Sequence, residues 1–298
     1  MIGAGEKPTP TGGRRYEHVH VIINPAAGKE EPILNILNDV FQQHRVDWDA
    51  FVTHGPGDAQ QLTELAIRDR VDAVAVYGGD GTVMEVVAGL EGRDIPVAIL
   101  PGGNANLLAK ELGIPLKLAD AAALLGTVPT LIQPLDMGVV GGYLFFRLGI
   151  GFQADLAREN SSPGIFSALF AMLRDPVPAT YRLQLDGTTV EHEAIGCLVT
   201  TYGKLPVPGL TLAHAIDPSD GLLDVILIQE ANLKTVLQAA AEALREGEMA
   251  DSLLQWQVKE VNISVTPPQS VLRDGELITP QTLDVHVVPQ TAPIIVPA

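Results

Sequence analysis

Apolar runs of strand length alternate with helix-spaced apolar residues along the first half of the chain. The strand-like runs cover residues 18–23, 46–52, 71–77 and 96–100. After the first run, apolar residues recur at the spacing of one helical face: Ile33, Leu34, Leu37, Val40 and Phe41. Strands that alternate with helices form βαβ units around a parallel sheet. We therefore predict a three-layer α/β domain over residues 16–133.

The pattern changes after Pro134, where short strand-like runs are separated by turn dipeptides. These dipeptides are Gly141-Gly142, Asp186-Gly187, Asp220-Gly221 and Asp274-Gly275. Such pairs are typical of tight turns between antiparallel strands. The pattern predicts a C-terminal antiparallel β-sandwich domain with helices over residues 134–298, whose last residues can return to the first domain. The helices are expected at residues 164–173 and 232–246.

Composition excludes some classes of partner. A net charge of −17 argues against nucleic acid, because phosphate backbones are bound mainly through Lys and Arg, of which the chain has only 19. The one cysteine, Cys197, lies in an apolar run and is expected in the core. Residues 1–13 lack an apolar signal core, and no run reaches the ~18 apolar residues that span a membrane. We expect a cytoplasmic protein whose membrane contact is peripheral and brief.

The strongest chemical signal is Gly78-Gly79-Asp80-Gly81-Thr82, directly after the third strand-like run. Glycines let backbone N–H groups approach a phosphate closely, and the positive end of the helix that follows points to the same place. A carboxylate repels phosphates unless it holds Mg²⁺ or accepts a proton from a hydroxyl nucleophile. The motif therefore indicates phosphoryl transfer. The alternative is a structural turn in which Asp80 caps a helix.

Two other polar, glycine-containing loops follow strands in the same way. Residues 24–29 read Asn-Pro-Ala-Ala-Gly-Lys, and residues 101–106 read Pro-Gly-Gly-Asn-Ala-Asn. Ligands of open α/β sheets bind outside the carboxyl ends of the strands, so we expect the three loops to meet at one sheet edge. Neither a P-loop nor a Rossmann glycine motif follows a strand.

These motifs resemble those of the diacylglycerol kinase catalytic family, which includes bacterial lipid kinases and sphingosine and ceramide kinases. The segments that carry the resemblance also include GGDGTVMEVVAGL, LPGGNANLLAKELGIP, the DGLLDV run at Asp220 and the DGE triplet at Asp274. The resemblance extends from about Val19 to Val288. It implies an NAD kinase/diacylglycerol kinase-like fold with a nucleotide domain followed by a lipid domain.

The resemblance also implies ATP as the phosphate donor. Carried over by position, the residues that would surround ATP are Asn24, Pro25, Ala26, Ala27, Gly28, Thr53, Gly78, Gly79, Asp80, Gly81, Thr82, Val83, Gly103, Asn104 and Asn106. The family usually has Thr or Ser where this chain has Asn104, whose amide can still donate a hydrogen bond.

A Mg²⁺ site and a catalytic carboxylate are implied in the second domain. Asp220 and Leu222 match a structural Mg²⁺ loop of the family, in which a backbone carbonyl of Asp217 is a further ligand; a simple Asp-Gly turn is the alternative. Glu276 matches the proton acceptor proposed for the bacterial lipid kinases. Asp80 and Glu276 are thus both candidates for the base.

Two residues are candidates for substrate contact. Glu85 lies one helical turn beyond Gly81 and is a candidate for contact with the substrate. The alternative interpretation is that Glu85 is an ordinary exposed carboxylate on a helix. Many bacterial members have Asp where Gln153 stands, whereas sphingosine kinases share the Ala-Asp that follows, and their Asp recognises the lipid head group. Asp155 is therefore a candidate for head-group recognition, with a turn residue as the alternative. The apolar helix at residues 164–173 is either a gate for acyl chains or an interdomain helix.

The expected reaction is in-line attack of a lipid hydroxyl, at a membrane surface, on the γ-phosphate of ATP bridged by Mg²⁺. An NAD kinase-like enzyme and a catalytically weak protein that binds nucleotide or lipid are the alternatives, the latter because of Asn104 and Gln153. The oligomeric state is left open, with a homodimer as one option. His18 and His20 alternate on the first strand, and we interpret them as strand residues rather than ligands.

Overall fold

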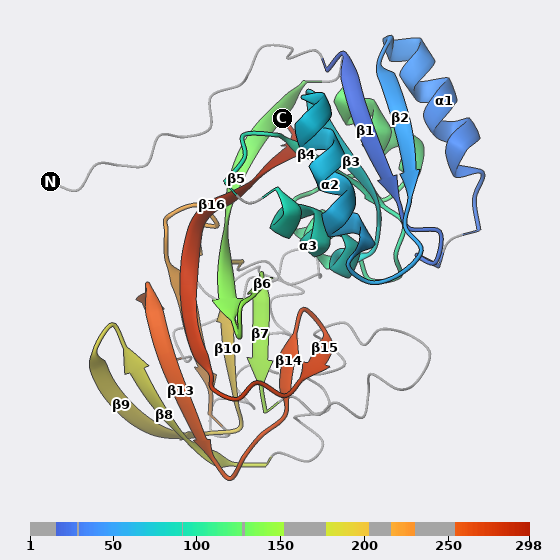
Figure 1. Cartoon of the computed structure of the whole chain (residues 1–298). Coiled ribbons are helices and arrows are strands. Elements are labelled where there is room, and N and C mark those ends of the chain that lie inside the picture. The colour runs from blue at the N-terminus through green and yellow to red at the C-terminus, as the bar shows by residue number, and fades with distance from the viewer. Residues whose placement is uncertain are drawn as a thin grey trace, which may run out of the picture. The chain divides into compact units, whose positions relative to one another are not determined.

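The computed structural model describes residues 16–28, 30–90, 92–126, 129–151, 177–202, 216–229 and 254–298 (Figure 1). Its contacts divide the chain into two compact units. The first comprises Met1–Leu135 and Gln290–Ala298, and the second is Asp136–Pro289. The division thus lies two residues after the boundary expected from the sequence, and the C-terminal segment belongs to the first unit.

The first unit is built on a parallel sheet. Its strands are β1 (His18–Ile23), β2 (Asp47–Val52), β3 (Ala73–Gly78), β4 (Val97–Pro101) and the end of β16 (Asp284–Pro297). They follow the order β2-β1-β3-β4-β16, and every one of these pairs is parallel. β3 and β4 are buried along their whole length, which is why they read as continuous apolar runs. The predicted α/β fold is confirmed.

Helices cover both faces of this sheet. They are α1 (Ile33–His44), α2 (Asp58–Asp69), α3 (Asp80–Gly89), α4 (Leu107–Glu111), α5 (Leu118–Ala122) and the 3₁₀ turn η1 (Ala123–Leu125). α2 packs against α3, and α1 packs against α5. Right-handed crossovers place α1 on one face and α2 and α3 on the other, because the chain reverses direction across the sheet after β2. The strand order therefore switches between β1 and β3, where α/β proteins bind ligands.

The second unit is an antiparallel β-sandwich. Its strands are β5 (Thr130–Val140, which starts in the first unit), β6 (Tyr143–Phe145), β7 (Arg147–Ile150), β8 (Ala179–Leu185), β9 (Thr188–Ala194), β10 (Gly196–Thr200), β11 (Leu223–Ile228), β12 (Leu254–Val258), β13 (Glu260–Thr266), β14 (Val271–Arg273), β15 (Glu276–Ile278) and the start of β16. One sheet has the order β12-β11-β10-β7-β14-β15, and the other includes β16-β13-β8-β9. Buried apolar side chains of both sheets form one core, so the predicted sandwich is confirmed.

Three of the four predicted turn dipeptides join consecutive strands, and the fourth, Asp220-Gly221, lies before β11. Gly141-Gly142, Asp186-Gly187 and Asp274-Gly275 join β5 to β6, β8 to β9 and β14 to β15, and both residues of each pair have positive φ. Cys197 is fully buried in the sandwich core, as expected. The helices expected at residues 164–173 and 232–246 lie outside the described residues. Within the described part of the chain, no helix is both long and apolar enough to span a membrane.

Candidate functional site

The loop after β1 contacts the loop after β3 at the switch point of the parallel sheet. Asn24 donates a hydrogen bond from Nδ2 to Oγ1 of Thr82 at 2.9 Å. Its backbone N–H donates to the carbonyl of Tyr77, the penultimate residue of β3, at 2.8 Å. The side-chain oxygen of Asn24 also accepts the N–H of Ala26, which fixes the turn itself. The first two predicted nucleotide loops are thus joined.

The loop after β4 is in close contact with the loop after β3. The N–H groups of Gly102 and Gly103 both donate to the carbonyl of Gly78, at 3.0 and 3.1 Å. A Cβ on Gly103 would lie 2.5 Å from Cα of Gly79, so only glycine permits this approach. The sequence predicted that the three loops meet at one edge, and this part of the prediction is confirmed.

Gly28 brings the end of the first loop against the third. It has φ of +95°, and a Cβ at this position would lie 3.0 Å from Oδ1 of Asn104. Asn104 itself is exposed. Its amide therefore lies beside the first loop, with a polar group at the position where the family usually has a hydroxyl.

The first turn of α3 provides an anion-binding terminus between these loops. Gly79 is the N-cap, in extended conformation, and no described side chain caps it. Uncapped N–H groups together with the positive end of a helix attract phosphate. The side chains of Thr82 and Val83 are buried and anchor this turn in the unit. The arrangement can therefore hold the phosphates of a nucleotide.

Asp80 caps a helix within the same edge of the sheet. Its Oδ2 and Oδ1 accept the N–H groups of Leu107 and Leu108, each at 3.0 Å, at the start of α4. Asp80 is half-buried, so its carboxylate is held in one orientation while part of it still faces solvent. A carboxylate oxygen can accept more than one hydrogen bond or bind a cation as well. The capping alternative is thus observed, and the reactive role of Asp80 stays a prediction.

Asn106 closes the third loop on itself. It has φ of 46° and is buried, and its Oδ1 accepts the N–H of Gly103 at 3.0 Å while its Nδ2 donates to the carbonyl of the same residue at 2.6 Å. Its side chain is thereby used within the loop. Asn106 therefore supports the shape of the loop, and direct contact with ATP stays a prediction.

Glu85 has a structural partner that the sequence did not reveal. Its two carboxylate oxygens accept the N–H groups of Gly57 and Ala59, at 2.9 and 3.2 Å, at the start of α2. Glu85 is half-buried, so the exposed-carboxylate alternative does not hold, and the expected substrate contact stays a prediction. Thr53 begins the segment that leads into α2; its side chain is buried, and its N–H donates to the carbonyl of Ile23 at 2.9 Å.

Carboxylates gather around the predicted Mg²⁺ loop of the second unit. Oδ1 of Asp220 accepts the N–H of Leu222 at 2.9 Å, and Oδ2 of the fully buried Asp136 accepts the N–H of Gly221 at 2.6 Å. The pKa of Asp220 is raised by lost hydration and by the charges of Asp217 and Asp136. Charged carboxylates at such a loop are unfavourable without a cation.

Asp224 extends the same group. It is buried, and its pKa is raised to about 6, mainly by desolvation and in part by the charge of Asp220. Its Oδ1 accepts a hydrogen bond from Gln255 at 2.6 Å. Hard oxygen donors with excess negative charge fit a Mg²⁺ ion. Asp220 and the carbonyls of Asp217 and Leu222 remain the predicted ligands.

The DGE triplet forms the β14–β15 turn. Oδ1 of Asp274 accepts the N–H groups of Phe146 and Arg147, at 3.2 and 2.9 Å, and so fixes the turn against β7. Glu276 starts β15 with its side chain 74% exposed, and its Oε2 lies 4.0 Å from Nη2 of Arg273. The aspartate is therefore structural, and the glutamate is accessible to a ligand.

Some functional candidates could not be placed, and others were missed. Asp155, Gln153 and the apolar segment at 164–173 lie outside the described residues. No local pattern pointed to Asp136, because its partner in the Mg²⁺ loop is 85 positions away in the sequence. Asp224 does lie in the DGLLDV run, where a buried carboxylate on a strand was a signal that could have been used.

Comparisons with known proteins agree with this geometry. Residues 18–140 match the diacylglycerol kinase catalytic domain, and residues 165–296 match the YegS C-terminal NAD kinase beta sandwich-like domain. A diacylglycerol kinase of Bacillus subtilis (strain 168) is 27% identical over 280 residues, covering 87% of this chain and 90% of the relative. A diacylglycerol kinase of Mycobacterium tuberculosis (strain CDC 1551 / Oshkosh) is 28% identical over 304 residues, covering 95% and 97%.

The fold is also similar to a solved structure. The crystal structure of a diacylglycerol kinase from Bacillus anthracis str. Sterne superposes with a TM-score of 0.79 at 24% sequence identity. The match covers 95% of this chain and 98% of that chain. The two-domain architecture read from the sequence is therefore that of a solved protein.

Proposed function

We propose that this chain, which belongs to the diacylglycerol kinase catalytic family, is an ATP-dependent lipid kinase that transfers the γ-phosphate to a lipid hydroxyl of the diacylglycerol or sphingoid type. The observation that carries the proposal is the meeting of three glycine-containing loops at the switch point of the parallel sheet, around the uncapped first turn of α3. A triphosphate is the ligand class that such an arrangement favours.

The loops bind and orient the donor. The first turn of α3 offers N–H groups to the phosphates, and the hydrogen bond from Asn24 to Thr82 holds the neighbouring loop beside that turn. Asn104 contributes an exposed amide at the same edge. Catalysis of phosphoryl transfer depends mainly on positioning and charge stabilisation, so loops fixed by backbone hydrogen bonds suit this reaction.

We assign different roles to the two candidate carboxylates. Both oxygens of Asp80 already accept N–H groups at the start of α4, which holds the carboxylate in one orientation. Glu276 is mostly exposed, and its Oε2 lies 4.0 Å from Nη2 of Arg273. We therefore propose Glu276 as the acceptor of the hydroxyl proton and Asp80 as the residue that positions the reacting phosphate and its cation.

At the reaction site, Mg²⁺ would neutralise the negative charge of the phosphates. In the second unit, a second Mg²⁺ would neutralise the negative charge of the acidic side chains. The ligands in the second unit would be Asp220 and the carbonyls of Asp217 and Leu222, beside the buried Asp136. We propose that this loop is a structural cation site that fixes the turn before β11.

The acceptor would be recognised by the second unit. We propose that Asp155 binds the lipid head group. We also propose that the enzyme contacts the membrane surface only transiently. The net charge of −17 favours brief contact over lasting attachment to an acidic bilayer. Glu85 would act indirectly, by holding the segment between Thr53 and α2.

Mass spectrometry of a lipid extract incubated with the protein, Mg²⁺ and labelled ATP tests this function. The expected product is a phosphorylated lipid that carries the label and is absent without enzyme. Parallel incubation with NAD tests the NAD kinase alternative, and calorimetry with ATP tests the binding-only alternative. Label transferred to NAD, or ATP binding with no labelled lipid from any extract, would contradict the proposal.

A further inference from the structure

Two imidazoles and two carboxylates converge on the α2 face of the parallel sheet. His18 and His20 alternate on β1, so both point to the same face, and Asp49 of β2 is the register partner of His20. Nε2 of His18 lies 3.1 Å from Oδ2 of Asp49. Nε2 of His20 lies 3.9 Å from the same oxygen and 3.7 Å from Oδ2 of Asp69, the last residue of α2.

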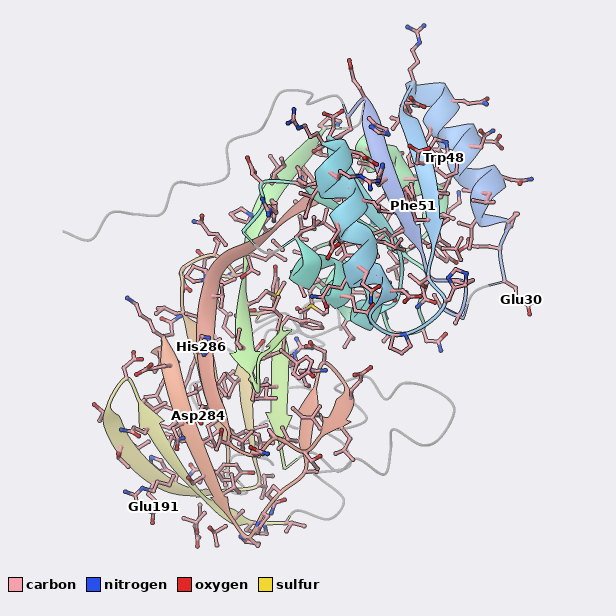
Figure 2. All side chains as sticks on the ribbon, viewed as in Figure 1. Glu30, Trp48, Phe51, Glu191, Asp284 and His286 are labelled. Carbon is pink, nitrogen blue, oxygen red and sulfur yellow. The ribbon has the colours of Figure 1, made fainter. Side chains whose placement is uncertain are left out.

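Neighbouring side chains pack around the cluster of His18, His20, Asp49 and Asp69. His20 is 1% exposed, and its ring packs against Phe51, labelled in Figure 2, with ring centroids 4.6 Å apart. Trp48 of the same strand packs instead against Phe41 of α1, on the opposite face. The cluster therefore lies between the sheet and α2, with one buried and one half-exposed imidazole.

The buried imidazole lacks hydrogen bonds. Among the described residues, Nδ1 of His20 has no hydrogen-bond partner, and the carboxylate oxygens of Asp49 and Asp69 lie beyond hydrogen-bond length from its Nε2. A buried polar group without a hydrogen-bond partner lowers the stability of the fold. A ligand placed between His20, Asp49 and Asp69 would supply the missing partner for Nε2.

The spacing of the donor atoms fits a small tetrahedral ion. The nearest donors of His18, His20 and Asp49 all lie within 4.8 Å of one another. In a tetrahedral site with metal–ligand bonds of about 2.0–2.2 Å, ligand atoms lie about 3.3–3.6 Å apart. The separations of 3.1, 3.7 and 3.9 Å lie on both sides of that range. Asp69 lies outside the group of three residues whose ligand atoms are all within 4.8 Å of one another, so its side chain would have to move toward the other three to become the fourth ligand.

We propose that His18, His20, Asp49 and Asp69 form a binding site for a divalent transition metal, with Zn²⁺ as the natural occupant. Imidazole nitrogens suit Zn²⁺ and its neighbours in the first transition row, whereas Mg²⁺ and Ca²⁺ take oxygen ligands almost alone. The site is thus chemically distinct from the Mg²⁺ sites of the kinase reaction.

Its position indicates a structural role. The four residues join β1, the edge strand β2 and the end of α2, so a bound ion would tie the edge of the sheet to its neighbours. Asn24 of the nucleotide edge is six positions beyond His18, which is about 20 Å along an extended strand. The metal is therefore expected to stabilise the first unit without changing the KM for ATP.

Two features limit the affinity. Oδ1 of Asp69 lies 3.2 Å from Nε of Arg68, whose positive charge opposes a second cation nearby. The unpartnered Nδ1 of His20 leaves that ligand without the outer hydrogen bond that usually supports a metal-bound histidine. We expect binding about 10–100-fold weaker than at sites whose histidines have such partners.

The test is titration of the metal-free full chain with Zn²⁺ by calorimetry and with Co²⁺ by visible absorption. His18→Gln and Asp49→Asn are the informative variants, because these side chains are 38% and 61% exposed and tolerate replacement. Wild type should bind one Zn²⁺ and give the absorption bands of tetrahedral Co²⁺. Each variant should bind at least about tenfold more weakly and lose those bands, with an unchanged circular dichroism spectrum.

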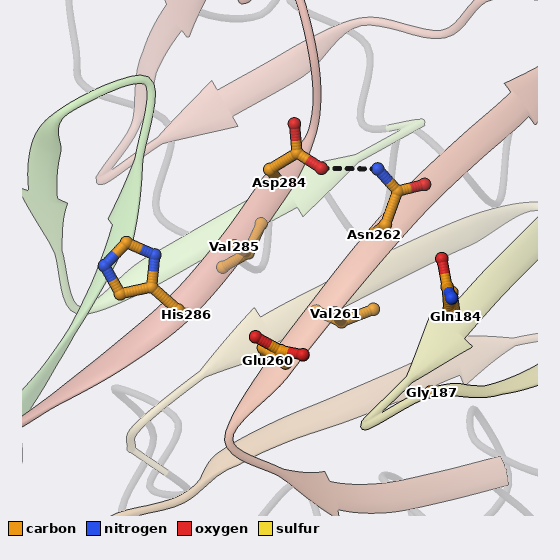
Figure 3. A pocket seen from close by; sticks show the side chains of 8 residues that line it. All are labelled: Gln184, Gly187, Glu260, Val261, Asn262, Asp284, Val285 and His286. Atoms are coloured by element: carbon orange, nitrogen blue, oxygen red, sulfur yellow. Dashed lines mark hydrogen bonds between the residues drawn. The ribbon is translucent and has the colours of Figure 1, made fainter.

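His286→Gln is the matched control. His286 is an exposed imidazole of β16 with Asp284 on the same strand and Glu260 opposite, around a hollow of about 320 Å³ (Figure 3). It has carboxylates nearby but no second imidazole within that hollow. The control should bind Zn²⁺ as wild type does, and Zn²⁺ should raise the melting temperature of both. The proposal is overturned if wild type binds no Zn²⁺, if His18→Gln binds equally well, or if excess Mg²⁺ displaces the ion.

Discussion

Nδ2 of Asn24 donates a 2.9 Å hydrogen bond to Oγ1 of Thr82, which joins the loop after β1 to the first turn of α3. These two residues are 58 positions apart and follow β1 and β3, which are neighbours in the sheet. The bond fixes the two sides of the switch point together. A phosphate-binding edge built in this way is preformed, so little ordering is needed when a nucleotide binds.

Gly103→Ala should disrupt that edge. The added Cβ would meet Cα of Gly79 at 2.5 Å, and a backbone atom cannot move aside as a flexible side chain can. We expect a loss of about 1–3 kcal/mol in the free energy of unfolding and a higher KM for ATP. Urea unfolding and steady-state kinetics measure the two effects.

Gly55→Ala is the control for this substitution. A Cβ at Gly55 would meet no atom of the described residues within 4 Å, and Gly55 has no positive φ. Its stability and KM should stay near those of wild type. Equal stability of the two alanine variants would refute the close approach of Gly79 and Gly103.

Glu85→Gln should reduce stability rather than substrate binding. The carboxylate accepts two N–H groups at the positive end of α2, and the amide keeps one acceptor and loses the charge. We expect a loss of about 1 kcal/mol in the free energy of unfolding, with the KM for lipid unchanged. A raised KM for lipid at unchanged stability would instead restore Glu85 as a substrate ligand.

Asp220→Asn should remove the response to Mg²⁺. Wild type should melt at higher temperature as Mg²⁺ is added, because burial and then the charges of Asp217 and Asp136 raise the pKa of Asp220, and a bound cation offsets this cost of the charged carboxylate. The variant should show no such rise. Asp217→Asn keeps the backbone carbonyl that the loop offers and should respond as wild type does. A Mg²⁺ response retained by Asp220→Asn would contradict the assignment.

Cys197 should be unreactive in the folded protein. Burial raises the pKa of its thiol from about 9 to about 12, so the reactive thiolate is not formed near neutral pH. The unfolded thiol ionises first, and this group therefore lowers the stability of the fold as pH rises above about 9. A thiol reagent should react only as denaturant unfolds the chain. Fast reaction in native buffer would show that the sandwich core is open.

Local patterns in the sequence identified most of the elements that place the site. Buried parallel strands are continuous apolar runs, so β1, β3 and β4 could be read directly. Asp186-Gly187 and Asp274-Gly275 have the positive φ angles that their residue types favour. The meeting of the loops followed from topology, because carboxyl ends of parallel strands lie at one edge.

Side-chain partners distant in sequence could not be read in this way. The bonds of Asp80 to Leu107 and of Glu85 to Gly57 join residues 27 and 28 positions apart, and no local pattern marks them. His20 is a further example. The sequence placed it on a strand, but no local pattern showed that the carboxylate of Asp69 lies beside its ring. Such contacts depend on helix packing and strand register, which periodicity alone does not specify.

The most direct test of the kinase account is transfer of labelled phosphate from ATP to lipid by wild type and by Asp80→Asn. The account predicts that the variant keeps its circular dichroism spectrum, loses about 1 kcal/mol of stability from the weakened α4 cap, and falls at least about 100-fold in kcat. An Asp80→Asn protein that phosphorylates lipid at near wild-type rate would contradict it.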